Sequence, residues 1–423
     1  MTRSTTTASA VVAPEVTTAP EDRLSPAVWA IAFACAISYM GIGLVDPILP
    51  TIARDLDASA GQTELLFSTY LFVTAITMFF TSWVSSRIGR RATLILGLAL
   101  VVTFAVASGA SPTVNWVIGF RGGWGVGNAL FVSTALAAIL GATANTTKAV
   151  MLYEAAMGAG MALGPLLGGT LGNISWRGPF FGTAALMALA LVGIAVRLPR
   201  EESRGAPREL AAPFRAIGRA DFRVFLAATL VYNFAYFIML AYAPFPIDNA
   251  ATVSGRTFTP LDLGLVFFGW GGLLALCSVL IAPRLTRRFG VRQTLMATML
   301  VLTALLAALV ALDTNLTAQI VGTIVGGGLV GIANTAMTEA AMEATDLPRD
   351  VASSTYSGFR FIGGAIGPTL TGPLSAAGGV AAPYVAAAIA MAATAGILLF
   401  EHVRLARPHE SATAEADIIG RAD

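Results

Sequence analysis

The sequence has few of the side chains that soluble proteins display. Only 12% of its 423 residues are charged, and it holds a single lysine, two histidines and two cysteines. A soluble domain carries about a quarter of its residues as charged side chains. His402 and His409 lie at the C-terminal end, so no metal site is expected. Cys35 and Cys277 have apolar neighbours, and we expect buried thiols rather than a disulfide.

Sequences that bind nucleotides are missing too. The chain has no Gly-x-x-x-x-Gly-Lys-Ser/Thr sequence, and its lysine, Lys148, lies in no such loop. Drive by ATP is therefore not expected, and no cofactor is predicted. The loops are too short to hold an active site, so the sequence argues against an enzyme.

Long apolar runs dominate what is present, since 56% of the residues are hydrophobic. A membrane-spanning helix needs about 20 apolar residues. The sequence predicts an all-α integral membrane protein with twelve spans, near 27–50, 64–85, 93–110, 114–141, 150–171, 179–198, 223–245, 262–282, 294–312, 316–341, 352–377 and 381–401.

Basic residues are distributed unevenly between the two sides of these spans. Of the 26, 21 fall on the side of the N-terminus, and Arg54, Arg177 and Arg256 fall on the other side. Arg121 and Arg360 lie within spans. Because basic loops stay in the cytoplasm, we expect a multi-pass protein of the cytoplasmic (inner) membrane with both termini in the cytoplasm.

Two sequences recur at nearly the same spacing. Gly160-Met-Ala-Leu-Gly164-Pro165 returns 203 residues later as Gly363-Gly-Ala-Ile-Gly367-Pro368, and the turn Arg87-Ile-Gly89 returns after 201 residues. The repeats predict a duplicated six-helix unit. We expect a disordered cytoplasmic tail at 1–25, six-helix bundles at 26–198 and 222–402, a cytoplasmic linker at 199–221 and a cytoplasmic tail at 403–423.

The segment from Glu154 to Gly172 is unusual for a span. It carries a carboxylate, a proline and a glycine at every fourth position from Gly160. Such a stripe lets a neighbouring helix approach closely, and Pro165 bends the helix. The glycine spacing and Pro165 together predict a kinked, tightly packed helix inside a bundle.

Three motifs in this chain resemble those of the major facilitator superfamily, and within it the twelve-span drug:proton antiporter group. The turn at 82–91 is similar to Gly-x-x-x-Asp-Arg-x-Gly-Arg-Lys/Arg, with Ser82 and Ser86 in place of Gly and Asp. The matching residues of that turn are Arg87, Gly89, Arg90 and Arg91. Arg121-Gly-Gly-Trp124-Gly-Val-Gly127 resembles the span-four motif, with Trp124 in place of Gln.

The third motif is the one typical of exporters in that group. The residues that match it are Gly160, Gly164, Pro165, Gly168 and Gly169. The resemblance implies two pseudo-symmetric six-helix bundles, conformational roles for the first and third motifs, and proton coupling at Arg121. In relatives the acid of this turn takes part in a charge pairing. This chain has Ser86 at that position, so the same pairing is not expected here.

Ionisable groups within a bilayer cost about 2.5–3.5 kcal/mol on insertion scales, so each is a functional candidate. We expect Asp46 and Arg121 to pair, and Glu154 to face a cavity and carry a proton or meet a cationic substrate. The alternatives are a water-facing helix-end acid for Asp46, a structural role for Arg121 and an interfacial charge for Glu154.

Three more charges lie in or near the later spans. Glu339 and Glu343 close span ten and are interpreted as loop-end charges, and Arg360 is expected to meet one of them. Because neither Arg121 nor Glu154 recurs in the second half, we expect the proton chemistry to lie in the first half.

Aromatic and amide side chains are the candidate substrate contacts. They are Tyr39, Trp124, Asn128, Tyr232, Asn233 and Tyr236. Aromatic rings around a carboxylate suit lipophilic cations. The alternative is that aromatic residues here face lipid or the headgroup region.

The sequence therefore favours a proton-coupled antiporter that exports small lipophilic compounds or drugs, cations among them. The alternatives are a proton-coupled importer of a small solute and a lipid or glycolipid flippase, both on the same scaffold. The expected partners are a small-molecule substrate, protons and the lipid bilayer, with no nucleic acid, and the chain is expected to work as a monomer.

Overall fold

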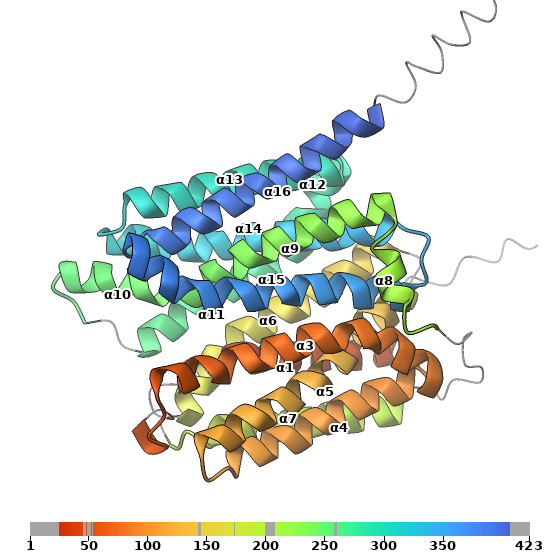
Figure 1. The fold of residues 1–423 in the computed structure, drawn as a ribbon, viewed down its shortest axis with the longest axis horizontal. Helices are drawn as coiled ribbons and strands as arrows, with labels where there is room; N and C mark the ends of the chain where they lie inside the picture. Colours follow the sequence, from red (N-terminus) through yellow and green to blue (C-terminus); the bar gives the residue numbers. More distant parts are fainter. Residues whose placement is uncertain are drawn as a thin grey trace, which may run out of the picture.

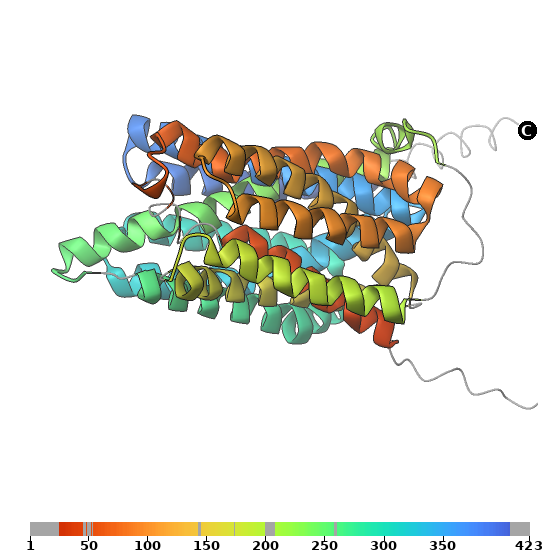
Figure 2. The ribbon, with the colours of Figure 1, turned by 90° about the horizontal axis from the view of Figure 1, so that it is seen from below.

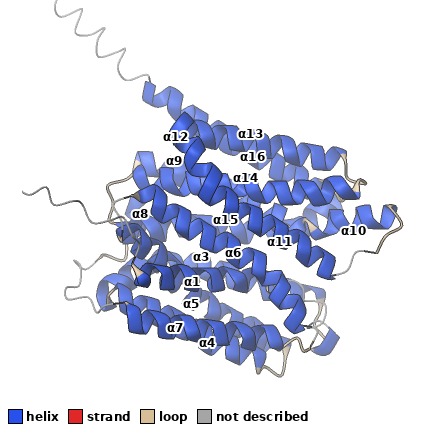
Figure 3. Ribbon diagram, turned by 180° about the vertical axis from the view of Figure 1, so that it is seen from behind, coloured by secondary structure: helices blue, strands red, loops and turns tan. Residues whose placement is uncertain are grey.

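A computed structural model describes residues 25–44, 48, 52, 54–142, 145–172, 174–198, 208–257 and 260–406. All regular structure in these residues is helical (Figure 3), which confirms the all-α prediction. The helices are α1 (Pro26–Gly43), α3 (Ala60–Ile88), α4 (Arg90–Gly109), α5 (Val114–Gly141), α6 (Thr146–Gly172), α7 (Gly178–Arg197), α8 (Ala212–Ala216), α9 (Ala220–Tyr242), α10 (Pro244–Val253), α11 (Pro260–Leu276), η2 (Cys277–Ile281), α12 (Ala282–Phe289), α13 (Val291–Ala311), α14 (Leu316–Glu343), α15 (Arg349–Gly378) and α16 (Ala382–Ala406).

The long helices run side by side along one axis of the molecule (Figures 1 and 2). In Figure 1 the helices of the first half, coloured red to yellow-green, lie below those of the second half, coloured green to blue. The two groups meet where α6 packs on α11 and α3 packs on α15. Residues from both halves therefore reach the centre of the bundle.

Ten helices in the described chain are long and apolar enough to cross a membrane. Two of the twelve predicted spans are outside this set. One is in α1, which contributes a shorter apolar helix, Pro26–Gly41. The other is in α15, which is 30 residues long and carries Arg349, Asp350 and Arg360. The exact number of twelve stays a prediction.

The glycine stripe of α6 lies against the backbone of α1. A Cβ atom added at Gly160 would lie 2.1 Å from the carbonyl oxygen of Ala36, and one at Gly164 would lie 2.7 Å from that of Met40. A Cβ atom at Gly168 would meet Leu44 in the same way. This is the close helix approach that the spacing predicts. Pro165 lies within α6.

The second half repeats this contact between α15 and α9. A Cβ atom at Gly363 would lie 2.3 Å from the carbonyl oxygen of Leu230, and one at Gly367 would lie 2.5 Å from that of Phe234. The glycines and their partner carbonyls both recur along the chain. The duplication seen in the sequence is therefore also a duplication of helix packing.

Two glycine turns separate α3 from α4 and α12 from α13. Gly89 has φ 89° and ψ 154°, and Gly290 has φ 84° and ψ 152°. Side chains rarely adopt a φ in this range, so glycine is favoured at both turns. We call the end of the bundle that carries these turns, with Arg87–Arg91 and Arg287–Arg292, the basic end.

Candidate proton and substrate site

A buried ion pair joins the two halves of the molecule. One guanidinium nitrogen of Arg360, on α15, donates to Glu154 Oε1 at 2.8 Å, and another donates to Glu154 Oε2 at 3.2 Å. The two side chains are 3% and 0% exposed. Both carboxylate oxygens are thus engaged by one arginine, which is the strongest geometry for this pair.

Polar neighbours complete the surroundings of the pair. The Thr338 hydroxyl, on α14, donates to Glu154 Oε1 at 2.9 Å and also lies 2.9 Å from the Tyr356 hydroxyl. The Arg360 guanidinium also lies 2.7 Å from the sulfur of Met157. Three helices, α6, α14 and α15, therefore hold the charges in place.

Tyrosines surround the ion pair. Tyr39 and Tyr153 share a hydrogen bond of 2.6 Å between their hydroxyl groups. Tyr232 and Tyr236 are buried as well, and all four hydroxyl groups lie close enough to interact with the charges of Arg360 and Glu154. The structure thus brings together three predicted substrate residues, Tyr39, Tyr232 and Tyr236, around Glu154.

Tyr232 and Tyr236 belong to a stack of near-parallel rings. Their ring centroids are 6.1 Å apart, and Tyr236 stacks on Trp270 of α11 at 5.9 Å. The Tyr236 hydroxyl donates to the sulfur of Met161 at 2.9 Å. Flat rings and thioether groups form a polarisable surface that suits planar apolar ligands.

The two predicted asparagines have separate surroundings. The Asn233 amide donates to the Thr229 carbonyl of its own helix at 2.8 Å. The Asn128 side-chain oxygen accepts a hydrogen bond from the Ser38 hydroxyl and so joins α5 to α1.

Arg121 and Trp124 lie in a different environment, inside the first half. Arg121 Nε donates to the Leu66 carbonyl at 2.6 Å, and its guanidinium lies 4.8 Å from the centre of the Tyr70 ring and 5.4 Å from that of Trp124. Trp124 also packs edge-on against Phe180. Asp46, the predicted partner of Arg121, lies outside the described residues.

The motif residues of the basic end hold helix ends together. Arg87 lies over the Trp83 ring, and Arg91 donates to the Leu198 and Ala195 carbonyls at 2.8 and 2.6 Å. In the second half Arg292 donates to the Leu398 carbonyl. Arg90 follows Gly89 as the first residue of α4. Gly169, unlike its stripe neighbours, has open space where a Cβ atom would lie.

Ser86, the residue in place of the motif's acid, contacts the linker. Its hydroxyl accepts a hydrogen bond from the Arg208 backbone N–H at 2.9 Å. The Arg208 side chain in turn bonds Asp350 of α15 at 3.2 Å. One linker residue therefore contacts both halves at the basic end.

Two expectations about charges were wrong. Arg360 meets Glu154 and not Glu339 or Glu343, because α15 directs it toward α6 across the interface of the halves. Glu339 is only 5% exposed and accepts a hydrogen bond from Thr147 of α6, so it is not a loop-end charge. Glu343 is exposed, as expected.

Sequence reasoning missed several residues around the pair. Thr338, Tyr356, Tyr153 and Trp270 were not candidates, although each is a polar or aromatic residue within a span. Their type was visible, but the sequence gave no signal for which helix faces they share.

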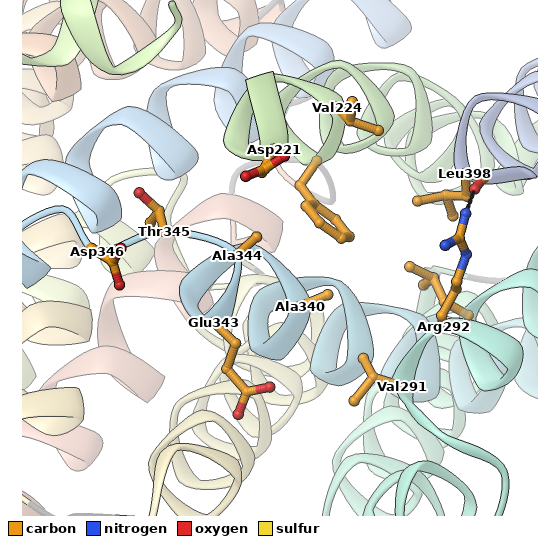
Figure 4. A pocket seen from close by; sticks show the side chains of 12 residues that line it. Asp221, Val224, Val291, Arg292, Ala340, Glu343, Ala344, Thr345, Asp346 and Leu398 are labelled. Carbon is orange, nitrogen blue, oxygen red and sulfur yellow. Dashed lines mark hydrogen bonds between the residues drawn. The ribbon is translucent and has the colours of Figure 1, made fainter. Parts of the chain in front are cut away.

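A cavity of about 540 Å³ lies elsewhere, at the basic end of the second half (Figure 4). It lies between α9, α13, α14 and α16, is partly open to the outside, and is lined by Asp221, Val224, Phe225, Val291, Arg292, Leu295, Ala340, Glu343, Ala344, Thr345, Asp346 and Leu398. None of the residues around Glu154 borders it.

Comparisons with known proteins place the chain among transporters. The profile described as Major Facilitator Superfamily matches residues 31–249 and 247–419. The chain is 44% identical over 384 residues to "Multidrug efflux protein YfmO" of Bacillus subtilis (strain 168), covering 90% of this chain and 94% of that protein. It is 29% identical over 287 residues to "Tetracycline resistance protein, class C" of Escherichia coli, covering 62% and 68%.

A solved structure has a similar fold. The crystal structure of the human organic anion transporter MFSD10 (TETRAN) superposes with a TM-score of 0.73 at 17% identity, over 90% of this chain and 100% of that one. At this level of identity the likeness concerns the fold alone.

Proposed function

Because the chain belongs to the Major Facilitator Superfamily of membrane transporters, we propose that it is a proton-coupled antiporter. It exports small lipophilic compounds, cations among them, from the cytoplasm by alternating access. The names of its relatives, a multidrug efflux protein and a tetracycline resistance protein, support the direction and the class of substrate.

The ion pair between Glu154 and Arg360 is the observation that carries this proposal. It links α6 of the first half to α15 of the second with almost no exposure. Arginine stays charged at any physiological pH, so the carboxylate is the partner that can take a proton. Protonation would remove the attraction and leave a buried cation unpaired, which is unfavourable by about 3–5 kcal/mol for pairs of this kind.

Breaking the pair would favour another arrangement of the halves. A ligand shifts a conformational equilibrium by the difference in its affinity for the two states. Here a proton on Glu154 disfavours the conformation in which Arg360 lies against it. Proton binding and the movement of the halves are thereby coupled.

The rings around the pair supply the substrate surface in this proposal. Tyr39, Tyr232, Tyr236 and Trp270 offer flat apolar faces close to a carboxylate. A lipophilic cation gains both from burial against rings and from charge. Trp124, Asn128 and Asn233 contact the parts of a larger substrate that extend from this surface into either half.

The remaining assignments belong to the same proposal. Asp46 and Arg121 form a second proton-sensitive group, and the Arg87–Arg91 turn and the glycine motif of α6 control the movement. The bundles are 26–198 and 222–402, joined by the linker 199–221, with the tails 1–25 and 403–423 in the cytoplasm. The protein acts as a monomer in the cytoplasmic membrane.

Everted membrane vesicles test the proposal. Vesicles with an acidic interior should accumulate ethidium, a fluorescent lipophilic cation, when they contain the wild-type protein. Glu154→Gln should abolish the accumulation driven by the gradient, while Glu343→Gln, an exposed glutamate on α14, should leave it intact. No accumulation by the wild type over a panel of lipophilic probes, or full activity of Glu154→Gln, would contradict the proposal.

A further inference from the structure

A second carboxyl group is buried between the halves, and the mechanism above does not use it. Glu339 lies one turn from the end of α14 and is 5% exposed. Its Oε1 accepts a hydrogen bond from the Thr147 hydroxyl, at the start of α6. A side chain of the second half is therefore covered by a helix of the first half.

Glu339 is separated from the Glu154 pair along the bundle axis. Thr147 precedes Glu154 by seven residues of α6, which is about 10 Å at 1.5 Å per residue. Its neighbours on α14, Ala340 and Glu343, line the cavity of the second half (Figure 4), but Glu339 does not. Glu339 thus belongs to the interface with α6 near the basic end.

The surroundings of Glu339 favour a neutral carboxyl group. Its Oε2 is buried and has no hydrogen-bond partner in the described part of the chain. The groups there that act on it are the Thr147 hydroxyl, from α6, and the Glu343 carboxylate, from α14 itself. No ion pair of the described residues includes Glu339, although Lys148 follows Thr147.

In the described part of the chain Glu154 has an arginine partner and Glu339 has no cationic partner. An ionised carboxylate removed from water without a partner is highly unfavourable, whereas a protonated one needs only its hydrogen bonds. Charge on Glu343, one turn away, adds repulsion. The same interface therefore places one glutamate beside a cation, Arg360, and the other beside a neutral hydroxyl group, that of Thr147.

We propose that Glu339 is a further proton-binding site, distinct from Glu154 and from Asp46, and that it is occupied while the basic end is closed over it. When α6 and α14 separate there, the carboxyl group meets water and its proton passes to that water. The opening movement rests on the proposed function, but the bound proton in the closed conformation does not.

Infrared spectroscopy of the purified full-length protein in lipid nanodiscs at neutral pH tests the bound proton. The wild type should show the C=O stretching band of a buried protonated acid. Glu339→Gln should lose it, and Glu343→Gln should retain it. Thr147→Val should keep the band but move it to higher frequency, because the acid loses a hydrogen-bond donor.

Each result decides the proposal without substrate or gradient. An acid band unchanged in Glu339→Gln, which thermal unfolding must show to be folded, would overturn it. If that variant does not fold, Thr147→Val decides, because a band that does not move assigns the proton elsewhere. These measurements do not use ethidium transport. Failure of the exporter proposal can therefore be told apart from failure of the Glu339 proposal.

A distance measurement tests the link to closure. Spin labels at Ile88 and Phe289, exposed residues of α3 and α12 at the basic end, report its opening after both native cysteines are replaced. At alkaline pH, Glu339→Gln should show a several-fold larger closed population than the wild type. Equal populations would refute the link.

Discussion

In the first half α6 lies against α1 through Gly160 and Gly164, and in the second half α15 lies against α9 through Gly363 and Gly367. The partner carbonyls of Ala36 and Leu230 are 194 residues apart, and so are those of Met40 and Phe234. The close contacts have thus been duplicated together with the helices.

The charges of the two halves have not been duplicated. At the offset of 203 residues, Glu154 corresponds to Ser357, and Arg360 corresponds to Met157. Arg360 also contacts the sulfur of Met157. A residue can touch its own counterpart only near the axis that relates the halves, so the ion pair lies on that axis. Helix packing is thus common to both halves, whereas the buried ion pair arises where their sequences differ.

The largest effect is expected at the unrepeated ion pair. Arg360→Leu leaves Glu154 buried without a cation and should destabilise the folded protein by about 3–5 kcal/mol. Replacing both residues, as Glu154→Met with Arg360→Leu, should restore most of the stability, because apolar substitutes for a buried pair are often neutral. Thermal unfolding of purified protein measures both. Equal stability of the single and double variants would contradict the coupling.

The repeated glycines should respond alike in the two halves. Gly160→Val and Gly363→Val each force a side chain into a neighbouring carbonyl, and each should lose about 1–3 kcal/mol or more. Gly169→Val serves as the matched control, since a Cβ atom there meets open space. The readout is the unfolding temperature of each variant. A large effect in only one half would show that the packing is not equivalent.

The arginines that bond helix ends give a smaller test of the same equivalence. Arg91→Ala frees the carbonyls of Leu198 and Ala195, and Arg292→Ala frees that of Leu398. With about 1 kcal/mol as the usual net value of one hydrogen bond, Arg91→Ala should lose about 2 kcal/mol and Arg292→Ala about 1 kcal/mol. Arg256→Ala, an exposed loop arginine, is the control. Effects on the unfolding temperature no larger than that of the control would show that water replaces these bonds.

Much of the fold follows from local sequence. Apolar run length predicts helices, glycine spacing predicts which face packs closely, and repeated sequences predict the duplicated unit. Apolar run length is a weaker guide in α15, where the polar residues Ser353, Ser354, Thr355, Ser357 and Arg360 are buried within the bundle.

The candidate site was harder to predict because its partners are far apart in the chain. Glu154 and Arg360 are separated by 206 residues, and their meeting depends on how two bundles are rotated against each other. Glu339 lies one turn from the end of α14, the position of a helix-end charge, but the Thr147 hydroxyl of α6 bonds it. The local sequence of α14 does not show which helix packs over this residue.

Arg208 connects the linker to both halves of the molecule. It bonds Ser86 of the first half and Asp350 of the second, so separation of α3 from α15 must break at least one of these bonds. Because Arg208 is part of the chain that joins the halves, it stays near both Ser86 and Asp350 when the halves separate. The two groups of the broken bond therefore keep a high effective concentration, which favours rapid reclosing over a long-lived open state.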